Sequence, residues 1–151
     1  MLALEELTQQ ARATYEKGLA KSYPYHTVQG TVGLWSKLPL SDTRAVDIEM
    51  DSTRALRTTV TTDHGPLAVY VAHLGSVRVM PRAGFWTAQR DAGAHALGNA
   101  IAAEPNERVV LLGDLNGTMD DRAFADITSR MQSAQDTAGG GFGFSWPAPH
   151  P

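Results

Sequence analysis

The chain contains two nearly continuous apolar runs, at residues 67–74 and 108–112. Runs of this length without polar alternation are typical of strands buried on both faces. Shorter apolar or alternating stretches predict further strands at residues 1–4, 25–29, 32–36, 45–50 and 55–62. An Asp-His-Gly-Pro turn cluster at residues 63–66 connects the last of these stretches to the first continuous run.

Three segments have the composition and spacing of helices. The first covers residues 8–21, where Thr8 can cap the N-terminus. Its predicted buried face is formed by residues at helical spacing, namely Leu7, Ala11, Tyr15 and Leu19. The other two helices are expected at residues 84–103 and 120–131, and residues 75–82 are expected to form a loop.

The order of these elements predicts an α+β domain. Helices alternate with strands, but a run of adjacent strands lies between the first two helices. This order favours two packed sheets with helices outside over a doubly wound parallel sheet. The 151 residues contain no repeat and no linker, so we expect one domain.

Composition narrows the classes of partner. Thirteen Lys and Arg against sixteen Asp and Glu give a net charge of -3, so the surface has no global attraction for nucleic acid. The absence of cysteine excludes disulfides and thiolate metal sites. No segment approaches the ~18 apolar residues of a membrane span. The chain begins almost at once in a strand-like run, from which we expect that upstream sequence is missing.

Polar side chains stand where predicted strands end. Glu6 follows the first strand, His73 lies near the end of the run at 67–74, and Asp114 and Asn116 follow the run at 108–112. Sites in α/β sheets gather where strands end and loops begin, so we expect these four side chains to meet if the strands are neighbours.

These residue types favour a hard metal ion. Two carboxylates at ~4 Å and an effective dielectric of ~20 repel by about 4 kcal/mol, and a divalent cation reverses that sign. Carboxylate and amide oxygens with one His suit Mg²⁺ or Mn²⁺ better than zinc. The reaction class that fits is metal-assisted attack of water on a phosphate ester.

The same residues lie in motifs that resemble one known family. Leu4-Glu5-Glu6 is similar to the Leu-Gln-Glu metal motif of the endonuclease/exonuclease/phosphatase family, with Glu6 on the metal-binding glutamate and Glu5 in place of the common Gln. The segment 33–40, Gly-Leu-Trp-Ser-Lys-Leu-Pro-Leu, is similar to the Gly-x-x-x-Ser-Arg-Tyr-Pro-Leu strand of that family.

Three further motifs follow in the order of that family. Val71-Ala72-His73-Leu74 resembles Asn-Thr-His-Leu, and Gly113-Asp114-Leu115-Asn116 resembles Gly-Asp-Phe-Asn. Phe144-Ser145-Trp146-Pro147 resembles the Thr-Trp-Pro that precedes an Arg-Ile-Asp strand. Together the motifs span nearly the whole chain, although each alone is weak.

The resemblance implies a DNase I-like four-layer α/β/β/α sandwich and a role for each residue. Glu6 would bind Mg²⁺ or Mn²⁺, together with Asp114 and Asn116. His73 would donate to a phosphate oxygen, and Asp114 would orient or activate the attacking water. Asn116 would hold the phosphate or the metal shell. The substrate would be nucleic acid or a lipid or small-molecule phosphate.

The chain also departs from the pattern of that family. It has no Asn on a strand before Glu6, and it ends at Pro151 before any Ser-Asp-His motif. Asp63-His64 lies in a turn and does not substitute for it. We therefore expect residues 1–151 to be a partial domain that lacks the C-terminal strands and the first N-terminal strand. The alternative function is a catalytically inactive fragment or a binding scaffold.

Other polar and aromatic residues have more ordinary interpretations. Trp35, Phe85, Trp86 and Tyr25 are expected to pack, and Asp136 is a weak candidate for the site. Arg82 and Arg90 are expected on a solvated surface, and no motif surrounds His26, His64, His95 or His150. A calcineurin-like phosphoesterase also uses a Gly-Asp turn, but its Asp-x-His and Gly-Asn-His-Asp motifs do not occur here.

Overall fold

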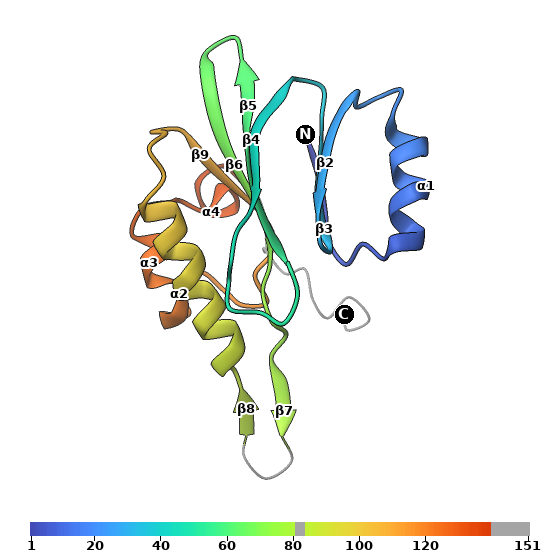
Figure 1. Cartoon of the computed structure of the whole chain (residues 1–151). Coiled ribbons are helices and arrows are strands. Elements are labelled where there is room, and N and C mark those ends of the chain that lie inside the picture. The colour runs from blue at the N-terminus through green and yellow to red at the C-terminus, as the bar shows by residue number, and fades with distance from the viewer. Residues whose placement is uncertain (81–83, 140–151) are drawn as a thin grey trace.

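A computed structural model describes residues 1–80 and 84–139 of the chain. Its first sheet contains three antiparallel strands in the order β1-β3-β2, which are Leu2–Leu4, Val32–Ser36 and Tyr25–Gln29. Helix α1 (Gln9–Leu19) connects β1 to β2 and lies outside this sheet (Figure 1). The Thr8 side chain accepts from the Ala11 N–H, which confirms Thr8 as the N-cap.

The second sheet contains four strands in the order β4-β5-β6-β9, which are Leu40–Ala45, Ala55–Thr62, Gly65–His73 and Val109–Asp114. The first three strands pair antiparallel, and β6 pairs parallel with β9, so this sheet is mixed. Helix α2 (Ala88–Ala102) makes the crossover from β6 to β9 and covers the outer face of this sheet (Figure 1).

Shorter elements complete the described chain. Strands β7 (Arg78–Met80) and β8 (Gly84–Trp86) lie between β6 and α2 in the sequence and form an antiparallel pair. After β9 come a 3₁₀ turn (Arg122–Phe124), α3 (Ala125–Thr128) and α4 (Ala134–Ala138). Among the residues that the structure describes, no helix is both long and apolar enough to cross a bilayer.

Strand β6 shows why the central run is almost continuously apolar. Successive side chains of a strand point to opposite faces, so its residues alternate between two cores. Val69 and Val71 join the core between the sheets, with Val32, Leu34, Leu56 and Val60. Ala68, Tyr70 and Ala72 join the core beneath α2, with Leu97, Phe124 and Ile127. The layer order is α/β/β/α, as the sequence predicted.

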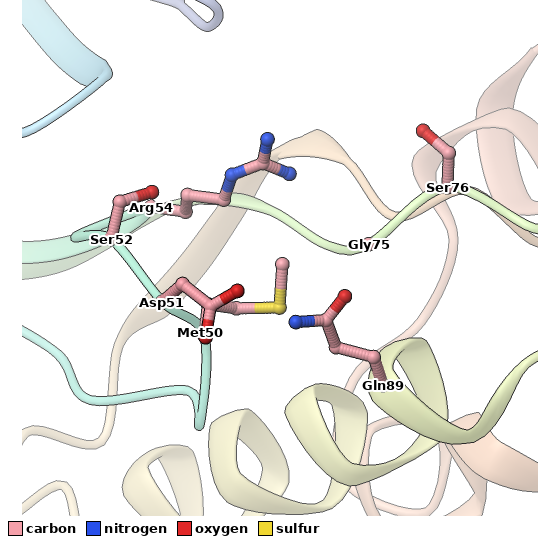
Figure 2. Close-up of a pocket in the computed structure, with 7 residues that line it drawn as sticks. All are labelled: Met50, Asp51, Ser52, Arg54, Gly75, Ser76 and Gln89. Carbon is pink, nitrogen blue, oxygen red and sulfur yellow. The ribbon is translucent and has the colours of Figure 1, made fainter.

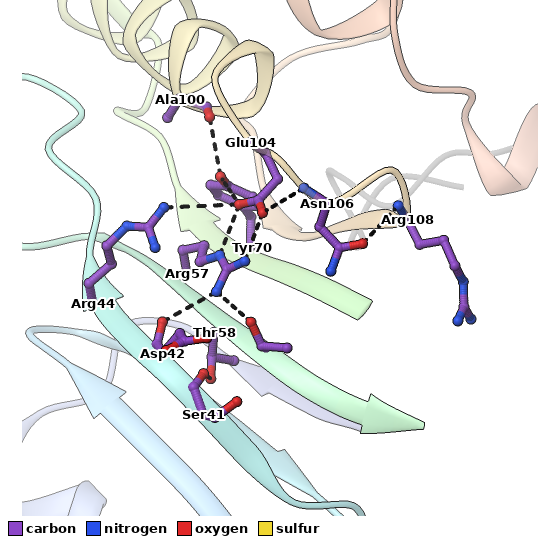
Figure 3. A network of polar contacts seen from close by, with 11 residues as sticks. Ser41, Asp42, Arg44, Arg57, Thr58, Tyr70, Ala100, Glu104, Asn106 and Arg108 are labelled. Carbon is purple, nitrogen blue, oxygen red and sulfur yellow. Dashed lines mark hydrogen bonds and ion pairs between the residues drawn. The ribbon is translucent and has the colours of Figure 1, made fainter. Parts of the chain in front are cut away.

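A buried network of hydrogen bonds connects the segment after α2 to the second sheet (Figure 3). The Glu104 carboxylate, whose side chain is fully buried, accepts from Arg57 Nη2 at 2.7 Å and Arg57 Nε at 2.9 Å. The Tyr70 hydroxyl donates to the same carboxylate at 2.9 Å. Burial and the hydrogen bond to Glu104 raise the pKa of Tyr70 to about 12, so Tyr70 stays a donor.

Several boundaries differ from the sequence prediction. The predicted strand at 45–50 is wrong, because the strand is β4 (Leu40–Ala45) and the alternating Val46 and Ile48 instead pack into the core beneath α2 from an irregular segment. The helix predicted at 84–103 begins at Ala88, since Gly84–Trp86 is a strand, and the loop predicted at 75–82 contains β7.

Two helix predictions are also corrected. The segment at 120–131 forms a 3₁₀ turn and one short helix rather than a single helix. Leu7, which precedes α1, is buried as predicted, with 5% of its surface exposed. Helix α1 itself buries none of its residues fully, and Tyr15 is 43% exposed, so the rest of the predicted buried face is wrong.

Candidate functional site

The parallel pairing of β6 and β9 places two predicted site residues side by side. His73 and Asp114 are the last residues of these strands and are partners in the register. The Leu74 N–H donates to the Asp114 carbonyl at 3.0 Å and continues the ladder by one residue. Strand β1 ends nearby, because its sheet packs on this one, and it brings Glu5 and Glu6 to the same edge.

His73 is the most buried of the predicted residues, with 3% of its surface exposed. Its Nε2 lies 3.9 Å from a Glu6 carboxylate oxygen. Its Nδ1 is buried and has no hydrogen-bond partner within the described residues. Leaving a buried ring nitrogen without a partner costs free energy. The imidazole is therefore held in place by the residues packed around it and not by a hydrogen bond at Nδ1.

Asp114 and Asn116 form a tight polar turn after β9. Asp114 Oδ1 accepts from the Asn116 N–H at 2.9 Å, and Asn116 Nδ2 donates to the Leu74 carbonyl at 2.9 Å. Asn116 has a φ of 51°, in the left-handed region that Asn tolerates better than most residues. Gly113 has a φ of 140°, and a Cβ there would collide with the Ala72 carbonyl oxygen, so the turn needs this glycine.

Glu5 lies at the same edge, although the sequence analysis gave it no role there. Burial raises the pKa of its carboxyl, the charge of His73 lowers it, and the carboxylates of Asp114 and Glu6 raise it further. Glu6, in contrast, has a side chain that is 81% exposed. The available signal was the acidic residue that stands at position 5 where the family pattern has Gln.

The sequence predicted Arg90 on a solvated surface, and this prediction is wrong, because only 6% of its surface is exposed. Its guanidinium pairs with Asp91 and Asp121, each at 2.7 Å, and donates to the Asn116 carbonyl at 3.2 Å. It also lies 5.7 Å from the centre of the Phe124 ring. Arg90 therefore connects the first turn of α2 to the Asn116 turn.

The predicted metal ligands fit the donor chemistry of a hard cation without forming a complete ligand set. Within residues 1–80 and 84–139, no group of three or more His, Cys, Asp or Glu side chains is gathered closely enough to hold an ion. The mutual repulsion of Glu5, Glu6 and Asp114 is nevertheless what a cation relieves. Mg²⁺ usually takes only one or two carboxylates and keeps several waters, so it needs few protein oxygens.

The remaining candidates lie away from this edge or outside the described residues. Trp35 is fully buried, as predicted, whereas Tyr25 is 41% exposed, so its assignment to the core is wrong. Three surface groups have local partners: His26 stacks on Trp35, the His64 carbonyl accepts from Arg108, and His95 pairs with Asp126. Asp136 is exposed in α4. Arg82, His150 and the Phe144-Ser145-Trp146-Pro147 motif lie outside the described residues.

Comparison with known proteins agrees with the fold. The model of the endonuclease/exonuclease/phosphatase family matches residues 1–151. No curated protein matches the sequence. Beta toxin from Staphylococcus aureus, solved with bound magnesium ions, is 18% identical with a TM-score of 0.66, covering 85% of this chain and 56% of that one.

Two other solved structures are similar to a comparable degree. Sphingomyelinase C from Streptomyces griseocarneus is 19% identical with a TM-score of 0.65, covering 84% of this chain and 55% of that one. TDP2 from D. rerio, complexed with a single-strand DNA product, is 20% identical with a TM-score of 0.59, covering 83% and 50%. The chain thus spans about half the length of these structures.

Proposed function

Because this chain belongs to the endonuclease/exonuclease/phosphatase family, we propose that it is a metal-dependent hydrolase of phosphate esters. One observation carries the proposal. His73 and Asp114 are register partners at the ends of parallel strands, and the carboxylates of Glu5 and Glu6 face them from another sheet. Residues from three distant parts of the chain thereby share one edge, where a phosphate and a cation can be bound together.

In this proposal, Glu6, Asp114 and Asn116 hold Mg²⁺ or Mn²⁺ through carboxylate and amide oxygens. Asn116 suits this role because its Nδ2 is occupied by the Leu74 carbonyl, which leaves its Oδ1 as the acceptor that can face a cation. A bound divalent cation would stabilise the negative charge that develops on the phosphate. Glu5 adds negative charge to the same edge and would strengthen cation binding.

Three side chains would bind the phosphate and activate the attacking water. His73 Nε2 donates to a phosphate oxygen, and its nearly complete burial holds the ring in one orientation. Asp114 accepts a proton from the attacking water, and its Oδ1 is oriented by the Asn116 N–H. Asn116 also contacts the phosphate through the cation shell. These groups bind, orient and move a proton, and no covalent intermediate on the protein is required.

The substrate class is open between nucleic acid and a lipid or small-molecule phosphate. The structures that resemble this chain include both a sphingomyelinase and a TDP2 with a DNA product. The net charge of -3 gives no global attraction for a polyanion, which favours a small or lipid phosphate over bulk DNA.

The proposal is tested by hydrolysis of bis(p-nitrophenyl) phosphate with and without Mg²⁺, using the whole chain. We expect turnover that needs Mg²⁺ and that falls by about 10²-fold or more in His73→Gln, because a donor to the developing charge is lost. His64→Gln, on an exposed turn, is the matched control and should leave the rate unchanged. Equal rates in both variants, or turnover independent of Mg²⁺, would refute the proposal.

A further inference from the structure

A pocket of about 290 Å³ lies beside the candidate site (Figure 2). It is lined by residues that precede β5, follow β6 and begin α2, namely Met50, Asp51, Ser52, Arg54, Gly75, Ser76 and Gln89. The Arg54 carbonyl accepts the His73 N–H at 2.9 Å, and Gly75 is two residues beyond His73. The pocket therefore adjoins the edge at which the ester would be cleaved.

The pocket contains polar groups whose bonding capacity is not used. The Arg54 guanidinium makes no hydrogen bond or ion pair within the described residues, although it can donate five. Arg57 of β5 and Arg90 of α2 differ, because each is paired with a buried or partly buried carboxylate. Ser52, Ser76 and Gln89 are exposed, and their side chains make no hydrogen bond to another residue in the part of the chain described here, so a ligand would compete with water for them.

The lining carries opposite charges that do not neutralise each other. Arg54 and Asp51 both line the pocket, but they form no ion pair. In Figure 2 the guanidinium lies on the same side as Ser76, whereas the Met50 and Gln89 side chains point toward each other on the far side of Gly75. A ligand with both an anionic group and hydroxyl groups would use both charges. Its anionic group would accept from the Arg54 guanidinium, and its hydroxyls would donate to the Asp51 carboxylate.

We propose that this pocket binds the hydroxyl-bearing, phosphorylated part of the substrate, as a sugar phosphate or polyol phosphate would present it. The phosphate would accept hydrogen bonds from the guanidinium of Arg54 and the hydroxyl of Ser52. The hydroxyl groups of the ligand would donate to Asp51 and contact Gln89 and Ser76. The lining is too polar for an acyl chain, because burying these groups against hydrocarbon would leave them without hydrogen bonds. This inference rests on the proposed phosphoesterase function and specifies its substrate class.

Binding can be measured separately from catalysis by NMR titration of the whole chain without Mg²⁺. The probes are ribose 5-phosphate, myo-inositol 1-phosphate, inorganic phosphate and octyl phosphate. We expect both hydroxylated phosphates to shift the amides of residues 51–54 and 75–76 and to bind more tightly than octyl phosphate. The tighter of the two identifies the source of the phosphate as a pentose or a cyclitol.

Variants identify which group binds which part of the ligand. Arg54→Gln should weaken all phosphates by about tenfold, whereas the exposed control Arg130→Gln should not. Asp51→Ala should weaken ribose 5-phosphate but leave inorganic phosphate equal or tighter, because it removes a hydroxyl acceptor and a repelling charge together. Preserved amide dispersion in each spectrum establishes that the variant is folded.

Each outcome separates this inference from the proposed function. Octyl phosphate binding as tightly as ribose 5-phosphate, or Arg54→Gln behaving like Arg130→Gln, would overturn the pocket assignment even if the ester is hydrolysed. Arg54-dependent binding of a hydroxylated phosphate with no Mg²⁺-dependent hydrolysis would support the pocket and refute the proposed function.

Discussion

Glu6 and Asn116 hold backbone conformations that L-residues rarely adopt. Their φ angles are 55° and 51°, and the only other described non-glycine residues with positive φ are Asp42 and Glu49. A left-handed conformation costs a non-glycine residue roughly 1–2 kcal/mol, and such strain clusters at functional sites. Two of the predicted site residues thus carry a conformational cost.

Replacement of Glu6 by glycine separates stability from function. Glu6→Gly should leave the free energy of unfolding unchanged or raise it by up to about 1 kcal/mol, because glycine adopts positive φ without the Cβ clash. The same variant should lose Mg²⁺-dependent hydrolysis. Urea denaturation and the ester assay measure the two effects.

Glu49→Gly is the matched control, since Glu49 is also exposed and has a φ of 57°. It should change stability in the same direction and leave hydrolysis intact. Equal loss of hydrolysis in both variants would show that backbone relaxation, rather than the Glu6 carboxylate, explains the effect.

At the scale of elements, Arg90 joins α2 to the turn that follows β9. Removal of its guanidinium breaks the contacts with Asp121 and the Asn116 carbonyl at once. Arg90→Met should therefore lower the free energy of unfolding by about 2–4 kcal/mol, because a carboxylate loses its partner. Arg90→Lys should cost less, since it keeps the charge but not the planar fork.

The Arg90 variants also report on positioning. At a temperature where Arg90→Lys is fully folded, its rate of ester hydrolysis should fall while the Mg²⁺ concentration for half-maximal rate rises, because Asn116 is less well held. Arg130→Lys, at an exposed position, should change neither quantity. A fall in stability without any change in Mg²⁺ dependence would make Arg90 a purely structural residue.

The Glu104 network predicts a pH dependence of stability. Hydrogen bonds from Arg57 lower the pKa of Glu104 to about 2, against 4.5 for the free carboxyl. Because the folded-state pKa is the lower one, this stabilisation is present above pH 4.5 and is lost as the pH falls toward 2. The free energy of unfolding should therefore fall steadily as the pH is lowered from 4.5 to 2.

Glu104→Gln removes that titration. The variant should be less stable at neutral pH by about 3 kcal/mol, since Arg57 loses the charge of its buried partner, but its stability should fall less between pH 4.5 and 2. Glu107→Gln, at an exposed position, is the control and should retain the wild-type slope. Parallel pH curves for Glu104→Gln and the wild type would contradict this assignment.

Element boundaries show where the sequence pattern was insufficient. Val46 and Ile48 alternate as in a strand and are both buried. The Val46 N–H still donates to the Ala55 carbonyl of β5, but residues 46–50 form no strand and pack on the core beneath α2. The true strand β4 carries Ser41, Asp42 and Thr43, whose polarity suits an edge that faces solvent on one side. Alternation reports burial, but it does not report whether a strand partner is present.

At the scale of the whole molecule, the two cores explain why the fold was predictable. The continuous run of β6 supplies apolar side chains to both faces, so it requires a layer on each side. The pairing of His73 with Asp114 was predictable for the same reason, since these residues end two of the most apolar strands. The pairing of Arg90 with Asp121 and the proximity of Glu5 to His73 and Asp114 join residues distant in sequence, which no local pattern reveals.

The proposed function depends on Glu6, Asp114 and Asn116 sharing one divalent cation, which remains a proposal. Substoichiometric Mn²⁺ added to the ¹⁵N-labelled chain tests it directly, because a paramagnetic ion broadens nearby amide signals. We expect the signals of residues 5–7, 73–75 and 114–117 to broaden first and together, and Asp114→Asn to abolish the effect. Broadening centred on another acidic segment, such as residues 47–51 or 120–126, with the strand ends unaffected, would contradict it.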